Sequence, residues 1–279
     1  MINFYTVTLI NNKNCIEKCL KNLRKLYKNN FYYTIICPSE SCKLFEDLTS
    51  GINIKVVDED TIISFSSFKK LVYEISNIIS KTKHIKIKIN ENRLGWYYQQ
   101  VLKLSFLLEE SKSKRTTMID ADTILINKMP FYSGTKSNLF ATDYEKNKTY
   151  WETLNTIFEF KIPFNKWIST TCQINSLTPI ENKALLSKLE EYIPRNKNLS
   201  TAEWLSHIVI TAVLTTHKKI DGSSISEQDF IGYFLRFHFG TQPRKFLFLR
   251  EKVNFKLTKL QEKVASFFGF KHITYESWL

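Results

Sequence analysis

The 279-residue chain is expected to form an α/β fold, in which a mixed, mainly parallel sheet is flanked by helices. We expect a single domain with a helical C-terminal part. Residues 1–57 alternate strand-like and helix-like runs in the order β-α-β-α-β, which is typical of a parallel sheet with right-handed crossovers. Helical periodicity dominates the second half. The chain has only 7 glycines and 6 prolines, so a long linker or a disordered tail is not expected.

The individual elements follow from the spacing of apolar residues. In the helix predicted over residues 93–110, Tyr97, Val101 and Leu108 share one face. Two acids interrupt the apolar run 116–126, which predicts a strand, a turn and a second strand. The other predicted strands are residues 2–10, 31–37, 52–57, 84–89, 138–142 and 167–175, and the other predicted helices are residues 14–28, 41–48, 66–80, 180–192, 200–216, 226–237 and 251–268.

Composition restricts the class of protein. Forty basic residues against 27 acidic ones give a net charge of +13. A surface of this sign attracts the phosphates of nucleic acid, anionic lipid or small molecules. The five cysteines form no C-x-x-C pair, which favours reduced structural thiols over a zinc site.

No run approaches the roughly 20 apolar residues of a membrane span, and the N-terminus lacks signal-peptide features, so we expect a cytoplasmic protein.

The most informative motif is a pair of acids between two apolar runs, Asp120 and Asp122. Buried strands tolerate two acids when these are paired or bind a cation. Ligands of open α/β sheets collect at the carboxyl ends of strands, where this pair falls. Carboxylates suit Mn²⁺ or Mg²⁺, and such an ion would bridge them to a diphosphate. The alternative is a surface turn, because aspartate is common in turns.

A second motif lies on the predicted helix 93–110. Gln99 and Lys103 are four residues apart and therefore face the same way, which would suit contacts with a sugar and its phosphates. An aromatic residue at the helix start could support a nucleobase or a sugar ring. The alternative is a helix whose aromatic side chains fill the core and whose polar side chains lie in solvent.

These motifs resemble those of a family of bacterial proteins that are similar to GT-A-fold glycosyltransferases. Many of its members are associated with capsule or lipopolysaccharide synthesis. The family carries G-W-x-x-Q-Q-x-x-K-L shortly before a D-[AS]-D strand, and a later S-E-x-E-x-x-G-x-[YF] block. The corresponding segments here are residues 95–104, 120–122 and 226–233, with Asp229 at the second acid of the last block.

The resemblance implies a GT-A-like, Rossmann-like fold and a metal-dependent glycosyltransferase of bacterial surface polysaccharide synthesis. Residues 1–130 would bind the nucleotide-sugar donor, and residues 131–279 would bind a glycan or lipid-linked acceptor. Mn²⁺ or Mg²⁺ would bind to the acid pair, more strongly to the second acid than to the first. Inverting and retaining outcomes both stay open. The implied donor-binding residues are Thr8, Arg93, Gln99, Gln100, Lys103, Asp120 and Asp122.

Acceptor-side chemistry is assigned to Glu227 and Asp229, because an inverting transferase needs a carboxylate to take the proton of the acceptor hydroxyl. The alternative is that these acids stabilise a helix N-terminus through its dipole. His238 would complete the metal site, as a late histidine does in some GT-A families. A core or surface histidine is the alternative.

The stretch 250–271 predicts a basic amphipathic helix whose apolar stripe includes Leu260, Val264, Phe267 and Phe268. Such a helix would allow peripheral contact with an anionic membrane, on the inner face of the cytoplasmic membrane where a lipid-linked acceptor resides. The alternative is an ordinary core helix with a solvated basic face.

Two other function classes stay open. The positive charge, with 13 Tyr and 21 Phe, suits a nucleic-acid-binding protein, although no binding motif is found. The acid pair suits a metal-dependent phosphohydrolase or nucleotidyltransferase. Such enzymes usually need further acids or histidines for a second metal, and no dense acidic cluster is visible.

Overall fold

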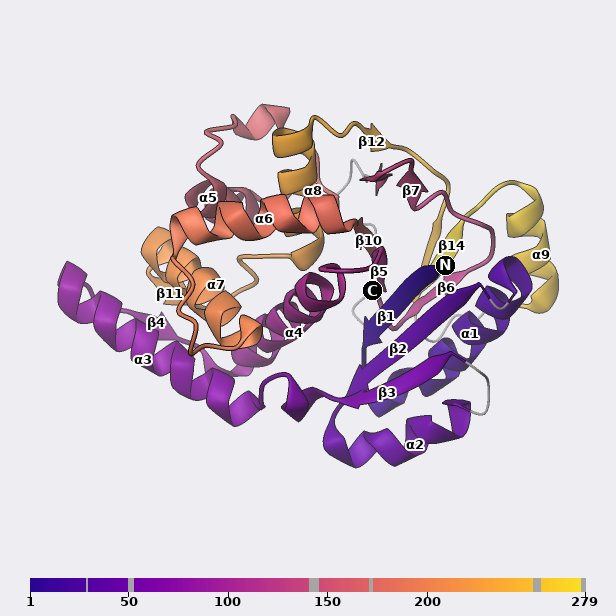
Figure 1. Cartoon of the computed structure of the whole chain (residues 1–279), viewed down its shortest axis with the longest axis horizontal. Helices are drawn as coiled ribbons and strands as arrows, with labels where there is room; N and C mark the ends of the chain where they lie inside the picture. The colour runs from indigo at the N-terminus through magenta and orange to yellow at the C-terminus, as the bar shows by residue number, and fades with distance from the viewer. Residues whose placement is uncertain (29, 50–52, 141–145, 171–172, 253–256, 277–279) are drawn as a thin grey trace.

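The computed structural model describes residues 1–28, 30–49, 53–140, 146–170, 173–252 and 257–276. Its centre is a five-stranded sheet in the order β10-β5-β1-β2-β3 (Figure 1). Four strands are parallel, and β10 runs antiparallel to β5 at one edge. This arrangement confirms the predicted mixed, mainly parallel sheet. The strands are β1 (Ile2–Val7), β2 (Phe31–Cys37), β3 (Ile54–Asp58), β5 (Thr116–Ile119) and β10 (Ile174–Leu177).

Helices cover both faces of this sheet because successive strand side chains point to opposite sides. Phe4 packs in one apolar cluster with side chains of α1 and α2, and the next residue, Tyr5, packs in another with side chains of α4, α7 and α8. The sheet therefore lies between two helical layers. These helices are α1 (Lys13–Tyr27), α2 (Cys42–Glu46), α4 (Leu94–Glu110), α7 (Thr201–His217) and α8 (Glu227–Phe239).

A helical part extends from one side of the sheet (Figure 1). It contains α3 (Phe65–Lys83), α5 (Lys148–Phe158), α6 (Pro179–Tyr192) and α7, with the short pair β4 (Lys88–Ile89) and β11 (Lys219–Ile220). Local sequence sets where two of these helices begin. Thr178 with Glu181, and Ser200 with Glu203, form capping boxes that satisfy the first free N–H groups of α6 and α7.

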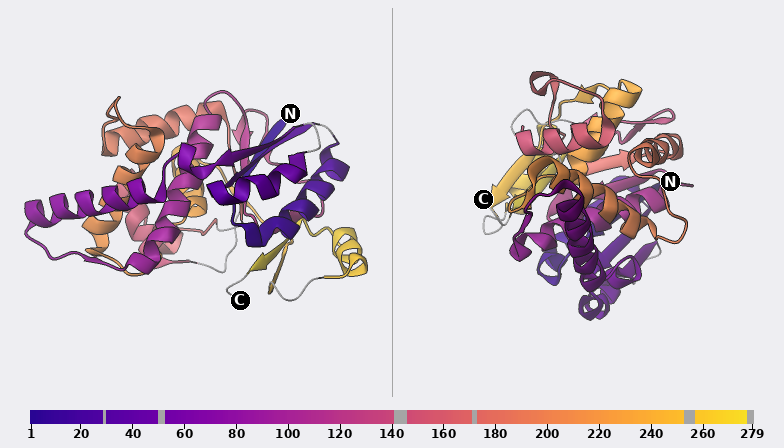
Figure 2. Two further views of the ribbon diagram at one scale, coloured as in Figure 1. Left: turned by 90° about the horizontal axis from the view of Figure 1, so that it is seen from below. Right: turned by 90° about the vertical axis from the view of Figure 1, so that its left-hand side faces the viewer.

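The C-terminal residues return to the sheet and add a three-stranded sheet beside α1 (Figure 2). In this sheet β14 pairs antiparallel with β6 and parallel with β13. Helix α9 connects β13 to β14. The three strands and this helix are β6 (Thr123–Leu125), β13 (Leu249–Lys252), β14 (His272–Glu276) and α9 (Lys259–Phe267). Smaller strands are β7 (Tyr132–Ser133), β8 (Lys136–Ser137), β9 (Leu139–Phe140) and β12 (Pro243–Arg244).

Several predicted boundaries need correction. The helix expected over 251–268 is a strand followed by the shorter α9, because β13 extends the sheet that β14 forms with β6. The strand expected over 84–89 is reduced to Lys88–Ile89. Residues 141–142, 171–172 and 253–256 of the predicted elements lie outside the described residues. No helix within the described ranges combines the length and apolar character that spanning a bilayer requires.

Helix α8 approaches the segment before β10 at Gly232. A Cβ atom at this position would lie 1.9 Å from Thr170 Oγ1, closer than any side chain allows. The glycine therefore lets α8 pack directly on this segment, which fixes where the N-terminus of the helix points.

We predict that Gly232→Ala lowers the free energy of unfolding by about 1–3 kcal/mol, because α8 or Thr170 must move. Urea denaturation followed by circular dichroism measures this loss. Gly95→Ala is the matched control, since a Cβ there has no atom within 4 Å. Alanine should stabilise α4 by up to about 1 kcal/mol at that site. Equal stability of Gly232→Ala and the native chain would contradict the packing argument.

Candidate active site

A cavity of about 940 Å³ opens where β1 and β5 end. These parallel neighbours place Val7 and Asp120 at the same edge of the sheet. Ligands of parallel α/β sheets bind at this edge. Side chains from α4, from the start of α8 and from the C-terminal strands complete the wall, so both halves of the chain contribute.

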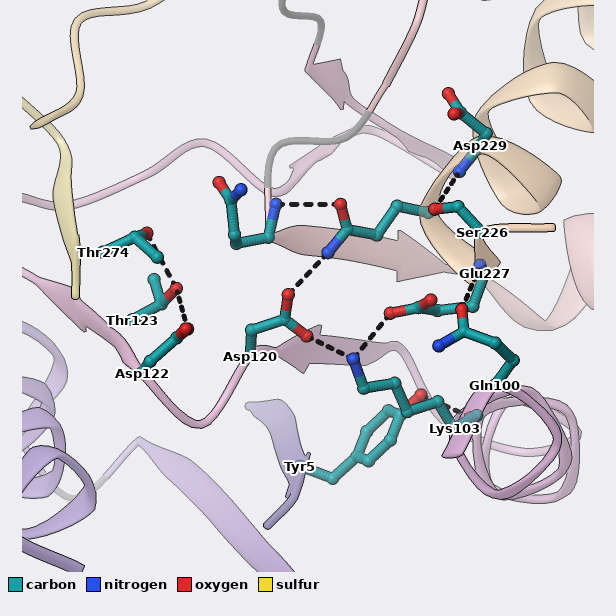
Figure 3. A network of polar contacts seen from close by, with 12 residues as sticks. Tyr5, Gln100, Lys103, Asp120, Asp122, Thr123, Ser226, Glu227, Asp229 and Thr274 are labelled. Carbon is teal, nitrogen blue, oxygen red and sulfur yellow. Dashed lines mark hydrogen bonds and ion pairs between the residues drawn. The ribbon is translucent and has the colours of Figure 1, made fainter. Parts of the chain in front are cut away.

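One lysine connects the acids at the base of this cavity (Figure 3). Lys103 Nζ donates to Asp120 Oδ1 at 2.6 Å and to Glu227 Oε1 at 2.7 Å. The lysine is 6% exposed and Glu227 is 3% exposed. Burial by itself lowers the pKa of the Lys103 ammonium, but Asp120 and Glu227 raise it further, so the net shift is upward. The ammonium therefore stays charged.

Two carboxylates face one ammonium, so the cluster has an excess of negative charge. Burial raises the pKa of the Glu227 carboxyl; Lys103 opposes this rise and Asp120 adds to it. A raised carboxyl pKa makes Glu227 a better proton acceptor near neutral pH.

Hydrogen bonds from uncharged side chains hold the same cluster in place. Gln100 Oε1 accepts a hydrogen bond from Glu227 N–H at 2.9 Å, and Tyr5 OH donates to the Lys103 carbonyl at 2.7 Å (Figure 3). Gln228 Nε2 donates to Asp120 Oδ2 at 2.7 Å. Side chains of α4 and α8 thus hold Asp120, and side chains of α4 hold Glu227. These contacts limit the geometries that the site can adopt.

Asp122 lies two residues beyond Asp120 and is bordered by the C-terminal strand. Its carbonyl accepts a hydrogen bond from Tyr275 N–H at 3.0 Å, and its Oδ1 accepts one from Thr123 Oγ1 at 3.4 Å. Thr123 Oγ1 in turn lies 2.9 Å from Thr274 Oγ1 (Figure 3). Residues more than 150 positions later in the chain therefore hold the acid pair.

Six of the residues predicted for the site line the cavity. They are Arg93, Gln99, Lys103, Asp120, Asp122 and Glu227. Two residues predicted to contact the nucleotide-sugar donor, Gln100 and Thr8, are buried and do not line the cavity. Gln100 is buried and binds Glu227 N–H, whereas the Thr8 hydroxyl donates to the Leu9 carbonyl.

Asp229 lies in the interior, outside the residues that line the cavity. It accepts a hydrogen bond from Thr170 N–H at 2.7 Å, and its own N–H bonds to the N-cap Ser226. Asp229 lies in the first turn of α8, where the predicted alternative places it, and its carboxylate ties α8 to the segment before β10.

His238 is not brought to the acid pair. It follows Glu227 by 11 positions in α8, which separates them by about 16 Å along the axis. Its ring stacks on Phe234 with centroids 4.8 Å apart. His238 is exposed, so its position corresponds to a surface histidine on α8.

The acid pair fits a divalent cation only together with a substrate. Mg²⁺ in proteins usually binds one or two carboxylates plus phosphate oxygens and water. Asp120 and Asp122 provide such oxygens at the cavity wall, and Asp120 shares its carboxylate with Lys103 and Gln228. Within the ranges that the structure describes, no three His, Cys, Asp or Glu side chains gather closely enough to hold an ion by themselves. Diphosphate and water would therefore supply the remaining ligands.

The sequence motifs did not identify several of the residues that line the cavity. Gln228 directly follows Glu227 and could have been found from its place in the motif, whereas Gln173 and Tyr150 lie in the middle region where no motif matched. Arg250 and Tyr275 reach the cavity only because β13 and β14 fold back onto β6.

The cavity has a basic rim above its acidic base. Arg93, Lys146, Lys148 and Arg250 all line it. Arg93 also lies over the Trp96 ring, 6.0 Å from its centroid. A phosphorylated ligand would therefore meet positive charge at the rim and carboxylates deeper in the cavity.

The sequence matches no known protein-family model, and a search of curated proteins gives no match either. Among solved structures, the chain is similar to mouse xyloside xylosyltransferase 1, with 10% identity over 99% of this chain and 98% of that one, at a TM-score of 0.48. It is also similar to galactosyltransferase LgtC in complex with donor and acceptor sugar analogues (8% identity, 74% and 70% coverage, TM-score 0.39). A third is the PaToxG glycosyltransferase (13% identity, 76% and 68% coverage, TM-score 0.32). Because all three TM-scores are below 0.5, the function has to be inferred from the cavity itself.

We predict that Lys103→Met lowers the free energy of unfolding by about 3–5 kcal/mol, because it leaves the buried Glu227 carboxylate and the partly buried Asp120 carboxylate without their shared cation. Urea denaturation at about pH 8 measures the loss. The loss should shrink at about pH 5, since a carboxyl whose pKa is raised by folding becomes protonated there and the repulsion ends.

Lys148→Met is the control for this charge cluster. Lys148 also lines the cavity, but its side chain is 69% exposed and lies 3.8 Å from Glu152. Its removal should change stability by less than about 0.5 kcal/mol. A Lys103→Met variant that matches this control at both pH values would contradict the assignment.

Proposed function

We propose that the chain is a glycosyltransferase that moves a sugar from a nucleotide-sugar donor to an acceptor hydroxyl. The observation that carries the proposal is the Asp120–Lys103–Glu227 cluster at the base of the cavity. It combines one carboxylate of the acid pair, Asp120, suited to a metal diphosphate, with a buried carboxylate, Glu227, suited to take a proton. A metal-dependent, inverting glycosyl transfer needs both within one cavity.

The donor would lie on the sheet side of the cavity. There Val7 ends β1 and Leu9 follows it, Asp122 follows β5, and Arg250 comes from β13. Mn²⁺ or Mg²⁺, when bound with the diphosphate, would neutralise charge on the departing group. The acid pair would hold the diphosphate in place, and the Arg250 guanidinium would attract its phosphates.

The acceptor would lie on the helical side. Trp96 at the start of α4 and Tyr150 at the start of α5 offer aromatic surfaces there, with Arg93 and Ser223 between them as polar partners. An aromatic face suits the apolar face of a sugar ring, and polar groups set its orientation.

Glu227 lies between these two sides and would take the proton of the attacking hydroxyl. Its carboxyl pKa is raised by burial, so proton uptake relieves a buried charge. Lys103 and Asp120 then remain as a neutral pair. Lys103 acts as a positioning residue in this scheme, because it orients both carboxylates.

The finer assignment follows the motif resemblance. We propose a role in bacterial capsule or lipopolysaccharide synthesis, with a glycan or lipid-linked saccharide acceptor at the inner face of the cytoplasmic membrane. In this scheme residues 1–130 supply most donor contacts and residues 131–279 most acceptor contacts, while Arg250 reaches the donor side and Trp96 the acceptor side. Support comes from the motifs at 95–104, 120–122 and 226–233, which supply Lys103, the acid pair and Glu227 to one cavity.

We predict that Asp122→Asn abolishes Mn²⁺-dependent binding of a nucleoside diphosphate. Thermal shift with uridine and guanosine diphosphates, with and without Mn²⁺, measures binding as stabilisation of the folded state. Asp47→Asn is the control, because its carboxylate is 81% exposed and lies outside the cavity. Unchanged stabilisation of a folded Asp122→Asn variant would remove this residue from the donor site.

We predict that Glu227→Gln keeps nucleoside diphosphate binding but lowers sugar transfer by roughly 100-fold or more, because the amide cannot accept the proton. Mass spectrometry of products from a panel of nucleotide sugars and acceptors measures transfer, and the exposed Glu190→Gln is the control. Full transfer by Glu227→Gln would refute its role. If the native protein cleaves nucleotides without transferring sugar, the phosphohydrolase alternative is favoured.

A further inference from the structure

Helix α9 exposes a large apolar face to solvent. Leu260 is 69% exposed, Val264 47%, Phe267 85% and Phe268 64%. Three of these four residues also line an open groove of about 350 Å³, whose other lining residues include Leu249, Leu257 and Phe270. Scattered exposed apolar residues are common, but a contiguous patch of large ones usually marks an interaction site.

The same end of the molecule is basic. Lys259 and Lys263 are exposed on α9 itself. Helix α1 lies beside α9, and the two are joined by an ion pair between Lys18 and Glu262 (Figure 2). Exposed cations continue along α1 at Lys21, Arg24, Lys25 and Lys28, none of which forms a salt bridge with another residue of the described ranges.

We infer that α9 and the exposed cations of α1 form a docking surface for a phospholipid bilayer with anionic headgroups. The apolar side chains of α9 would enter the boundary between headgroups and acyl chains, and the lysines and arginine would meet the lipid phosphates. Charge decides between this occupant and a second copy of the chain. Two such surfaces brought together would oppose like charges around the apolar contact.

The position of α9 connects this surface to the cavity. The strands on either side of the helix, β13 and β14, contribute Arg250 and Tyr275 to the cavity wall. Docking through α9 would therefore hold the cavity close to the bilayer. An acceptor carried on a lipid could then reach it, and this last point alone rests on the proposed function.

Vesicle sedimentation tests the surface directly. The full chain should bind vesicles of mixed phosphatidylglycerol and phosphatidylcholine, and should bind pure phosphatidylcholine vesicles at least roughly tenfold less. The double variant Phe267→Ser with Phe268→Ser should lose at least roughly tenfold in binding to the anionic vesicles. A matched control is Ile78→Ser with Ile180→Ser, which removes apolar side chains that are 61% and 60% exposed on other helices.

A second variant tests the charged part. Replacing Lys21, Arg24 and Lys25 by glutamate should also abolish binding to anionic vesicles. Equal binding by the phenylalanine variant and its control would overturn the inference. Failure of the native chain to bind either kind of vesicle would also overturn the inference. The inference would fail as well if the native chain binds no vesicles but forms a dimer through this face, and the phenylalanine variant dissociates that dimer.

These outcomes are separate from those of the proposed function. The vesicle experiment contains no nucleotide, and the thermal shift with nucleoside diphosphates contains no lipid. The phenylalanine variant should keep its nucleotide response, because neither side chain lines the cavity. Loss of vesicle binding with normal sugar transfer to a water-soluble acceptor would confirm that the two surfaces act independently.

Discussion

The structure of the cavity depends on one buried ammonium group. Lys103 comes from the middle of α4, and its partners come from the end of β5 and the start of α8. A buried charge is tolerated when it is paired and hydrogen-bonded. If one of these three charged groups were removed, the desolvation cost of the others would no longer be offset by their ion pairs. The ion pairs therefore tie together three elements that local sequence cannot align.

The neighbouring polar groups turn this ion cluster into an oriented site. Gln100 meets the backbone of Glu227, Tyr5 meets the backbone of Lys103, and Gln228 meets the second oxygen of Asp120. Such a network leaves the carboxylates few alternative rotamers, which is the preorganisation that catalysis requires. Burial in this network also raises the pKa of the Glu227 carboxyl, against the opposing charge of Lys103. One arrangement thus provides both the rigidity and the basicity of the proposed site.

The C-terminal strands give the molecule a second level of organisation. Tyr275 and Thr274 on β14 support the loop that carries Asp122, and β13 adds Arg250 to the cavity wall. The helix between these strands contributes no residue to the cavity lining, and its apolar side chains line a separate groove. Because one β-α-β unit contributes to both regions, a bilayer contact at α9 and a ligand in the cavity would involve the same unit of structure.

The sequence by itself determined the elements whose signals are local. The β-α-β-α-β start, the helix around Tyr97 to Leu108, the acid pair after a strand and the Ser226 cap of α8 all follow from periodicity and capping between near neighbours. Together with the motif resemblance, these signals selected six of the residues that line the cavity. They could select residue types, but they carry no information on which partners those residues meet.

Only the tertiary structure decided those partners. Lys103 and Glu227 are 124 positions apart, so no local pattern indicates that the lysine holds the acids, or that Asp229 binds Thr170 instead of a ligand. Likewise, the stretch expected to form one basic helix is divided because β13 pairs with β14. Pairing between distant segments depends on the burial and hydrogen bonding of the whole chain, which the spacing of residues along a single segment does not encode.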